Sequence, residues 1–433
     1  MKRFLTLLLS VPIILSLWAV EPTEDMRQKA SNYYAYPLER SEVPELTPAP
    51  KGYEPFHIEH YGRHGSRWHI GQKAYNKPVE ILEIAERNKQ LTPRGEELLA
   101  QLRQLQKASI GRDGELSPLG AIQHRGIARR MVHNFPEVFA DSGYVTARSS
   151  TVVRCILSMD NELQEMLAHN PSLRITSDAS EADMDYIARN DTTGMEPGAW
   201  YRTSQKIEQL MRDYSKQHPD SYDFIDVIIK YPQFARDSLP VANLFHYLYN
   251  VAANAQSLDR SQFPNFAPYD IFTPEEMENR WRTQNTRWFL RAGNSQLTEG
   301  IRPMAQSHLL RNIIESADSA MTSPNHGANL RFGHEVILLP LTVLLDLDGY
   351  GVEINDLDGI EQIWRDYEIF PMGSNIQLIF YRPEGSTNPD DVLVKALLNE
   401  REVTLPVDPV SGPYYRWSDL RKHYLDKIST KSK

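Results

Sequence analysis

The chain has 433 residues, of which 41% are hydrophobic, 24% charged and 10% aromatic, so it suits two or three globular units and is not disordered, collagen-like or coiled-coil. Its 57 acidic residues outnumber the 47 basic ones, giving a net charge of −10. This balance argues against a general nucleic-acid binder and requires any anion site to gather its positive charge locally. The single cysteine, Cys155, excludes an intrachain disulfide and a cysteine-based metal cluster.

Residues 1–20 have the features of a secretory signal peptide, with Lys2 and Arg3 before a long apolar stretch. A retained membrane anchor is the alternative, because the stretch approaches spanning length. Pro12 in its middle and the small Ala19 near its end favour cleavage. We therefore predict an exported protein, periplasmic or secreted, that is free of the membrane once the peptide is removed.

The first strand is expected at residues 56–61, where apolar and polar residues alternate, and it ends in the segment GRHGSR at 62–67. Two helix starts follow, because Thr92 and Ser117 each precede a proline. A hydroxyl cap before a proline at the first helical position is typical of a helix N-terminus.

The next strand–helix unit begins with a short strand at 144–147 that ends in Arg148. The hydroxyl residues 149–151 are expected to cap a helix over 152–169. Residues 173–176 form another strand candidate.

The C-terminal part shows the same order of elements. A strand at 330–332, a turn at 333–335 and an apolar helix at 336–345 are expected, followed by late strands at 376–381 and 392–394.

Between these flanks, residues 184–324 are largely helical and lack a βαβ rhythm. We therefore predict an α/β domain with three layers and a central, mostly parallel sheet, formed by 21–183 and 325–433. The helical residues 184–324 are predicted to form an inserted cap.

Three clusters share one expected geometry, a short strand followed by a tight turn and a helix start: residues 63–67, 148–150 and 333–335. In open α/β sheets ligands bind beyond the carboxyl ends of the strands, so all three can reach one pocket. Each residue alone has a simpler structural explanation, as a cap, a solvated strand end or a salt-bridge partner. Together they suit a phosphate monoester, because arginine forks match tetrahedral oxyanions and a histidine can be a nucleophile.

The segment RHGSR at 63–67 resembles the RHGxR signature of the histidine phosphatases, in the branch of acid phosphatases, phytases and multiple inositol polyphosphate phosphatases. LSPLG at 116–120 is similar to the family's LTxxG helix start, and RSSTVVR at 148–154 to its RSTxxxR segment. GHE at 333–335 lies where the family has His-Asp or His-Ala-Glu. The order and spacing of these motifs over 56–335 make the resemblance specific.

The resemblance implies a covalent mechanism, in which His64 attacks phosphorus and becomes phosphohistidine. Glu335 would protonate the leaving alkoxide and then activate water. Four residues would hold the phosphoryl oxygens: Arg63, Arg67, Arg148 and His334. No metal or other cofactor is expected, because the arginines neutralise the phosphate. Arg154 is expected to brace the site.

Two departures from the family pattern leave questions open. Glu335 follows His334 directly, one methylene longer than His-Asp and one residue shorter than His-Ala-Glu, so the proton donor and the substrate class stay undecided. Trp68 and His69 also stand in the region where a proline is common. The indole of Trp68 either floors the pocket or covers the sheet edge.

Basic and aromatic residues cluster on one predicted helix of the insertion: Arg280, Trp281, Arg282, Arg287, Trp288 and Arg291. The simpler interpretation is a solvated basic face with its tryptophans in the core. The alternative is that some of these arginines face the cleft and hold further phosphates of a polyphosphorylated substrate.

These features predict an exported phosphomonoesterase acting on small-molecule phosphate esters, among which inositol polyphosphates such as phytate are candidates. A secreted phosphate-ligand binding protein without turnover is one alternative, although the presence of both His64 and Glu335 argues against it. A phosphotransferase that passes phosphate to an alcohol is another. No obligate protein partner and no nucleic acid are expected.

Overall fold

The computed structural model describes residues 23–36, 45–263, 266–323 and 325–429. The signal peptide predicted at 1–20 lies outside these residues. Within the described ranges, none of the helices combines the length and hydropathy needed to cross a bilayer.

One mixed sheet forms the centre of the protein, with strands in the order β3-β2-β4-β1-β5-β6-β7 and β8 paired to β6. The strands are β1 Tyr53–Arg63, β2 Tyr144–Ser149, β3 Arg174–Asp178, β4 Gly327–Gly333, β5 Asn375–Pro383, β6 Leu393–Leu398, β7 Arg401–Val403 and β8 Tyr415–Arg416. The pairings from β3 to β1 are parallel and those from β1 to β7 are antiparallel. The predicted α/β class is confirmed, but the sheet is mixed where a mostly parallel one was expected, because only the pairings among β3, β2, β4 and β1 are parallel.

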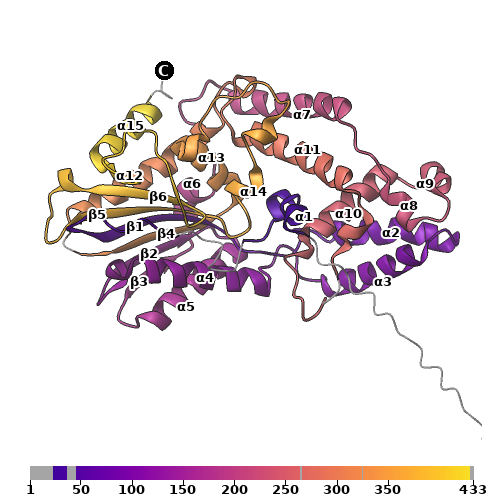
Figure 1. Cartoon of the computed structure of the whole chain (residues 1–433), viewed down its shortest axis with the longest axis horizontal. Coiled ribbons are helices and arrows are strands. Elements are labelled where there is room, and N and C mark those ends of the chain that lie inside the picture. The colour runs from indigo at the N-terminus through magenta and orange to yellow at the C-terminus, as the bar shows by residue number, and fades with distance from the viewer. Residues whose placement is uncertain (1–22, 37–44, 264–265, 324, 430–433) are drawn as a thin grey trace, which may run out of the picture.

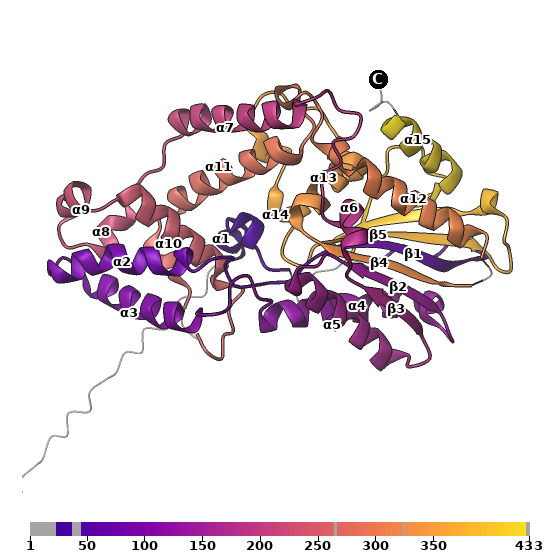
Figure 2. The same ribbon diagram turned by 180° about the vertical axis from the view of Figure 1, so that it is seen from behind.

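Helices cover both faces of the sheet, as Figures 1 and 2 show. On one face α4 (Pro118–Asn134) and α5 (Val153–His169) pack against apolar strand residues such as Ile58 and Phe332. On the other face α12 (Ser307–Met321), α13 (Glu335–Leu345) and α15 (Trp417–Ser429) pack against residues such as Phe380. Alternation along each strand sends successive side chains to these two layers, so both faces of the sheet are buried.

A separate helical lobe lies beyond one end of the sheet (Figure 1). It consists of α2 (Lys73–Arg87), α3 (Pro93–Ala108), α8 (Phe224–Ile228), α9 (Pro232–Ser238) and α10 (Val241–Ala255), which share one hydrophobic core. The packing crosses the boundaries predicted for the domains. Helices α2 and α3 precede residue 184 but pack in the lobe, whereas α12 lies within 184–324 but packs on the sheet.

The remaining α-helices are α1 Glu24–Gln28, α6 Met184–Ile187, α7 Ala199–Gln217, α11 Pro274–Ala292 and α14 Asp366–Ile369. The N-terminal segment that contains α1 lies between the lobe and the sheet in both views (Figures 1 and 2). Tyr249 of α10 donates a hydrogen bond to the carbonyl of Lys29, and the amide of Met372 donates to the carbonyl of Tyr34. The segment therefore joins the two parts of the molecule.

Two of the three helix caps predicted from the sequence are present in the structure. The hydroxyls of Thr92 and Ser117 accept hydrogen bonds from the third amide of α3 and α4, at 3.0 and 3.3 Å. The predicted hydroxyl cap of α5 is wrong. Its cap residue is Val152, whose side chain makes no capping bond, because β2 extends to Ser149 and the hydroxyl of Ser150 lies instead against His334.

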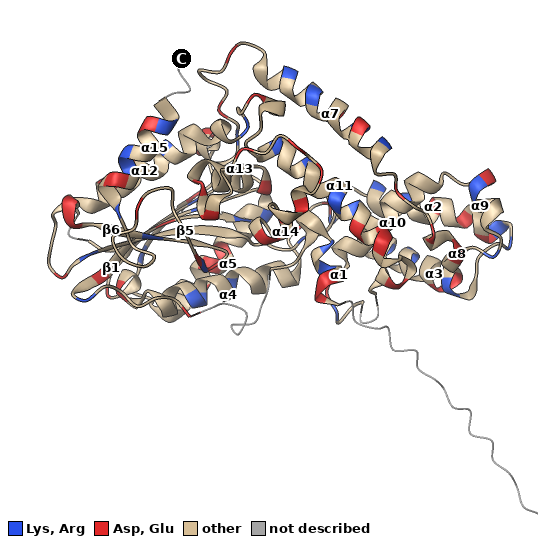
Figure 3. Cartoon of the chain, turned by 45° about the horizontal axis from the view of Figure 1, so that its top comes forward, with Lys and Arg blue, Asp and Glu red and all other residues tan. Residues whose placement is uncertain are grey.

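Charged residues of both signs are interspersed along the helices, for example on α7 and α11 (Figure 3). This mixture agrees with the acidic net charge and gives the coloured ribbon no broad basic face. Arg63 and Arg67, in contrast, are almost fully buried in the interior.

Candidate active site

Parallel pairing of β1 with β4 brings the two predicted histidines together. Arg63, the last residue of β1, pairs with Gly333, the last residue of β4, so His64 and His334 leave the sheet side by side. Their rings lie 5.5 Å apart, centre to centre, at an angle of 71°. Ser150 follows β2 in the same way, and its hydroxyl lies 3.3 Å from Nε2 of His334.

Arg63 is fully buried and is held by backbone from two distant segments. Its Nη1 donates to the carbonyl of Phe370 at 2.5 Å and its Nη2 to the carbonyl of Asn32 at 2.8 Å. Its Nε lies 3.3 Å from Oε2 of Glu335. Burial, with neighbouring Arg67, lowers the pKa of Arg63 to about 10, so it stays charged at neutral pH. Two fixed carbonyls thus orient a cation towards the site.

His64 is also fully buried, and one of its ring nitrogens is free to react. Nδ1 lies 3.0 Å from the carbonyl oxygen of Gly65, which can only accept, so the proton sits on Nδ1 and Nε2 carries the lone pair. Nε2 makes no hydrogen bond and lies 3.6 Å from Oε2 of Glu335. Burial, reinforced by Arg63 and Arg67, holds the pKa of His64 well below its usual range. The imidazole is therefore neutral even in mild acid.

Glu335 begins α13, and its side chain is 14% exposed. Burial alone raises the pKa of a carboxyl group, but Arg63, His64 and Arg67 outweigh burial and hold the pKa of Glu335 well below its usual range. Burial also lowers the pKa of His334 to about 4, with the nearby arginines adding to the shift. The unliganded site therefore contains a carboxylate, two neutral histidines and several cations.

Arg67 and Arg154 complete this positive cluster. Arg67 is 2% exposed. The charges of Arg67 and Arg154 both lower the pKa of Arg63 and that of His334, so both guanidinium groups lie near these two residues. Nε of Arg67 and of Arg154 is buried without a hydrogen-bond acceptor in the described chain. Arg67 keeps one hydrogen bond, from Nη1 to the carbonyl of Trp68 at 2.9 Å, and a buried N–H group that stays unpaired is costly unless an anion completes it.

Arg148 lies elsewhere, although it was predicted to hold phosphate. Its Nε pairs with Asp183 at 3.5 Å and its Nη1 donates to the carbonyl of Ala147. Arg148 is the penultimate residue of β2, so it still lies within the sheet. The residue opposite it on β4 is Arg331, which forms an ion pair with Glu59 beneath α12. The structure therefore brings together Arg63, His64, Arg67, His334 and Glu335, does not bring Arg148 to them, and adds Arg154.

The loop after His64 packs directly against the start of α4. A Cβ on Gly65 would lie 2.6 Å from the carbonyl oxygen of Gly120, and one on Gly120 would lie 2.3 Å from that of Ser66. The amide of Ser117 donates to the carbonyl of Ser66 at 2.8 Å, and the amide of Ser66 to Oε1 of Gln123. Only residues without a side chain fit at this backbone contact, which fixes the loop that carries His64.

One group within the site has the composition of a metal site. His64, His334 and Glu335 each offer a ligand atom, and these atoms lie within 4.8 Å of one another. The same space is flanked by Arg63 and Arg67, which favour an anion and oppose a divalent cation.

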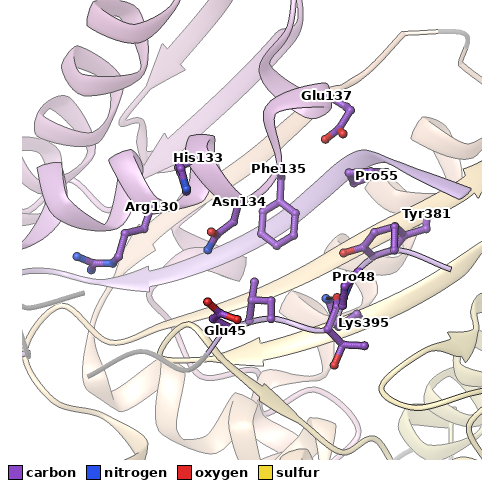
Figure 4. A pocket seen from close by; sticks show the side chains of 13 residues that line it. Glu45, Pro48, Pro55, Arg130, His133, Asn134, Phe135, Glu137, Tyr381 and Lys395 are labelled. Atoms are coloured by element: carbon purple, nitrogen blue, oxygen red, sulfur yellow. Dashed lines mark hydrogen bonds between the residues drawn. The ribbon is translucent and has the colours of Figure 1, made fainter. Parts of the chain in front are cut away.

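A cavity of about 930 Å³ lies between α4 and the strands β1, β5 and β6 (Figure 4). Its described lining contains none of the predicted site residues. Its cations are already paired, since Arg130 binds Glu400 through two hydrogen bonds and Lys395 binds Glu402 at 3.0 Å. This cavity therefore lacks the free positive charge of the histidine cluster.

Two open questions from the sequence are answered by packing. Trp68 is 3% exposed and packs edge-on against Tyr75 and Phe263 in the core of the helical lobe, where neither alternative had put it. Trp281 is likewise buried, whereas Arg291 is exposed and lines a second cavity beside α13.

Solved structures of similar fold are phosphatases. The multiple inositol polyphosphate phosphatase of Bifidobacterium longum, in its apo form, has a TM-score of 0.74 at 17% identity, over 92% of this chain and 97% of that chain. The phytase from D. castellii has a TM-score of 0.59 at 14% identity, over 94% and 85%. The apo phytase of Hafnia alvei has a TM-score of 0.53 at 12% identity, over 89% and 100%. At these identities the similarity shows a common fold.

The fold and the arginine–histidine cluster thus define the phosphatase class. No curated protein matches the chain in sequence. The chain belongs to the histidine phosphatase superfamily, branch 2, whose family model matches residues 62–399. This membership confirms the family and the class, phosphoric monoester hydrolase, that the sequence predicted.

Proposed function

We propose that this protein is an exported phosphomonoesterase that acts through a phosphohistidine at His64, with inositol polyphosphates such as phytate within its substrate range. The observation that carries the proposal is a neutral, buried imidazole whose unbonded Nε2 lies beside Arg63 and Arg67, cations whose Nε atoms also lack a hydrogen-bond acceptor in the described chain. The substrate class is supported by the fold shared with an inositol polyphosphate phosphatase and two phytases.

In the first step Nε2 of His64 attacks phosphorus, and the bond from phosphorus to the ester oxygen breaks. The proton on Nδ1 stays hydrogen-bonded to the carbonyl of Gly65, which stabilises the positive charge that forms on the ring. The phosphoryl oxygens are held by Arg63, Arg67, Arg154 and His334.

Glu335 supplies the proton for the leaving oxygen. Its carboxyl group is ionised in the unliganded site because Arg63 and Arg67 lower its pKa. A bound phosphate ester neutralises those arginines and adds negative charge, so the pKa of Glu335 rises and the group takes up a proton. Glu335 then protonates the alkoxide as it departs.

In the second step Glu335, now a carboxylate, accepts a proton from a water molecule as that water attacks phosphorus. The bond from phosphorus to Nε2 breaks, inorganic phosphate forms and His64 returns to its neutral state. The distance of 3.6 Å between Nε2 and Oε2 of Glu335 supports roles for both groups at one phosphorus atom.

The test is to trap the covalent intermediate. Rapid quenching of the enzyme with a radioactive phosphate ester is expected to give a protein-bound label that is labile in acid and stable in base, and His64→Ala is expected to abolish it. Persistence of that label in a folded His64→Ala protein contradicts the proposal.

Export depends on the predicted signal peptide at 1–20. The N-terminal sequence of the protein recovered outside the cytoplasm is expected to begin shortly after residue 20. Recovery of a chain that still carries Lys2 and Arg3 contradicts cleavage.

A further inference from the structure

A second cavity, of about 230 Å³, opens between α7, α11 and α13. Its apolar walls include Trp200, Trp288 and Leu339. Val336 also lines it, and Val336 is the residue directly after Glu335 in the first turn of α13. The lining of the cavity therefore begins on α13 one residue after the proposed proton donor, within the same helical turn.

The polar feature of this cavity is Arg302, whose side chain is almost completely buried. Its guanidinium stacks on the indole of Trp200, 4.1 Å from the ring centre. All of its hydrogen bonds are made by Nη2, to the hydroxyls of Thr203 at 2.7 Å and Ser204 at 3.1 Å and to the carbonyl of Trp200 at 3.4 Å. Nε and Nη1 are left without acceptors in the described chain, and Nε is fully buried.

No carboxylate among the described residues forms an ion pair with Arg302. The carboxylate that acts on the pKa of Arg302 is that of Glu299, which is itself paired with Arg202 at 2.7 Å. Burial, with Arg291 nearby, lowers the pKa of Arg302 to about 10, so the group is still a cation at neutral pH.

Arg291 adds a second positive charge to the lining of the cavity. Among the described residues its ionic partner is Glu208, at 3.7 Å, and Glu208 is shared with Arg287 at 3.1 Å. The one carboxylate in the described lining, Glu208, is thus shared by the exposed Arg291 and the half-buried Arg287 and does not pair with Arg302, so the cavity keeps an excess of positive charge.

We propose that this cavity binds a second anionic group of the substrate, a phosphate carried by the leaving group, through Arg302 with help from Arg291. The proposal rests on the phosphatase function proposed above. The volume suits one phosphoryl group with its attached carbon and is below the usual size of a site for a whole organic ligand. The stacked indole and the two hydroxyls fix the plane of the guanidinium, so its free N–H groups are preorganised for a tetrahedral anion.

The experiment measures binding directly, so that it does not depend on turnover. Isothermal calorimetry compares myo-inositol hexakissulfate, an unhydrolysable polyanion, with inorganic phosphate, which fills only the reaction centre. Arg302→Gln is expected to weaken hexakissulfate binding at least about tenfold, the scale of one charge-assisted hydrogen bond, and to leave phosphate binding unchanged.

Ser204→Asp gives the same test without removing Arg302. The new carboxylate lies beside Nη2 of Arg302 and compensates its charge, so the same selective loss is expected. Arg282→Gln is the matched control, because Arg282 lies on α11 but pairs with Glu278 and Glu361 away from the cavity. Thermal unfolding confirms that each variant is folded.

Hexakissulfate binding that is unchanged in both variants, or an equal loss for both ligands in a folded variant, overturns the proposal. Absence of hexakissulfate binding to the unmodified protein also overturns it. Failure of the proposed function shows separately, as binding of phosphate without release of phosphate from any ester.

Discussion

Two arginines of one segment, Arg148 and Arg154, lie in different surroundings, and their separate replacement tests how the site is built. Arg154 contributes to the positive potential at His334, whereas Arg148 pairs with Asp183 away from the cluster. Removing one preorganised donor to a developing oxyanion costs about 2.7–4 kcal/mol, so Arg154→Ala is expected to lower kcat/KM by about a hundredfold or more. Arg148→Ala loses one ion pair of 3.5 Å near the surface, worth at most about 1 kcal/mol of stability, and should leave kcat/KM nearly unchanged.

The assay is steady-state hydrolysis of 4-nitrophenyl phosphate by both variants, with inorganic phosphate as a competitive inhibitor and thermal unfolding as a check on the fold. Phosphate inhibition should weaken in Arg154→Ala, and Arg154→Lys should recover part of it, since a lysine keeps the charge but loses the fork. A hundredfold loss in Arg148→Ala together with near-normal kinetics in Arg154→Ala refutes the placement and restores Arg148 to the role predicted from the sequence.

Three further predictions concern Glu335, metals and pH. Glu335→Gln should lose about a hundredfold or more with an alkyl phosphate and distinctly less with 4-nitrophenyl phosphate, whose leaving group needs little proton transfer; equal losses would give Glu335 another role. Dialysis against a chelator should leave hydrolysis unchanged, and recovery of a lost activity by one added metal would contradict this. Since His334 takes a proton near pH 6.5 when unfolded and only near about 4 when folded, the unfolded state binds more protons in that window. The free energy of unfolding should therefore fall as the pH drops from 6.5 to 4, and His334→Gln should reduce this dependence in urea titrations; an unchanged slope would contradict it.

Local signals in the sequence predict the strands and helix starts that carry the site. The alternation before His64 and the hydroxyl–proline pairs at Thr92 and Ser117 depend on nearby residues only, and each appears in the structure at the expected place. Because β1 and β4 run parallel, the residues that follow these strands lie at the same edge of the sheet. The sequence alone therefore predicts that His64 and His334 share one site.

Contacts between distant segments could not be predicted in this way. The carbonyls of Asn32 and Phe370 hold Arg63, and a backbone carbonyl leaves no trace in residue type. The apolar faces of α2 and α3 indicate burial but not the partner, so their union with α8–α10 was missed.

The positions of Arg148 and Arg154 relative to the predicted strand and helix could have shown which of the two reaches the site. Residues at the site end a strand, follow one or lie in the first turn of a helix, as Arg63, His64 and Glu335 do. Arg148 lies inside β2, whereas Arg154 is in the first turn of α5.

The contact between Gly65 and Gly120 has a consequence for how this protein can vary. A substitution in a packed core is often relieved by a second, smaller residue opposite. Here each added Cβ would meet main-chain atoms, which no exchange of side chains removes. The two positions therefore cannot compensate for one another. A library that randomises both positions and selects for phosphate release should return glycine at each, so the loop of His64 and the start of α4 are inherited as one unit.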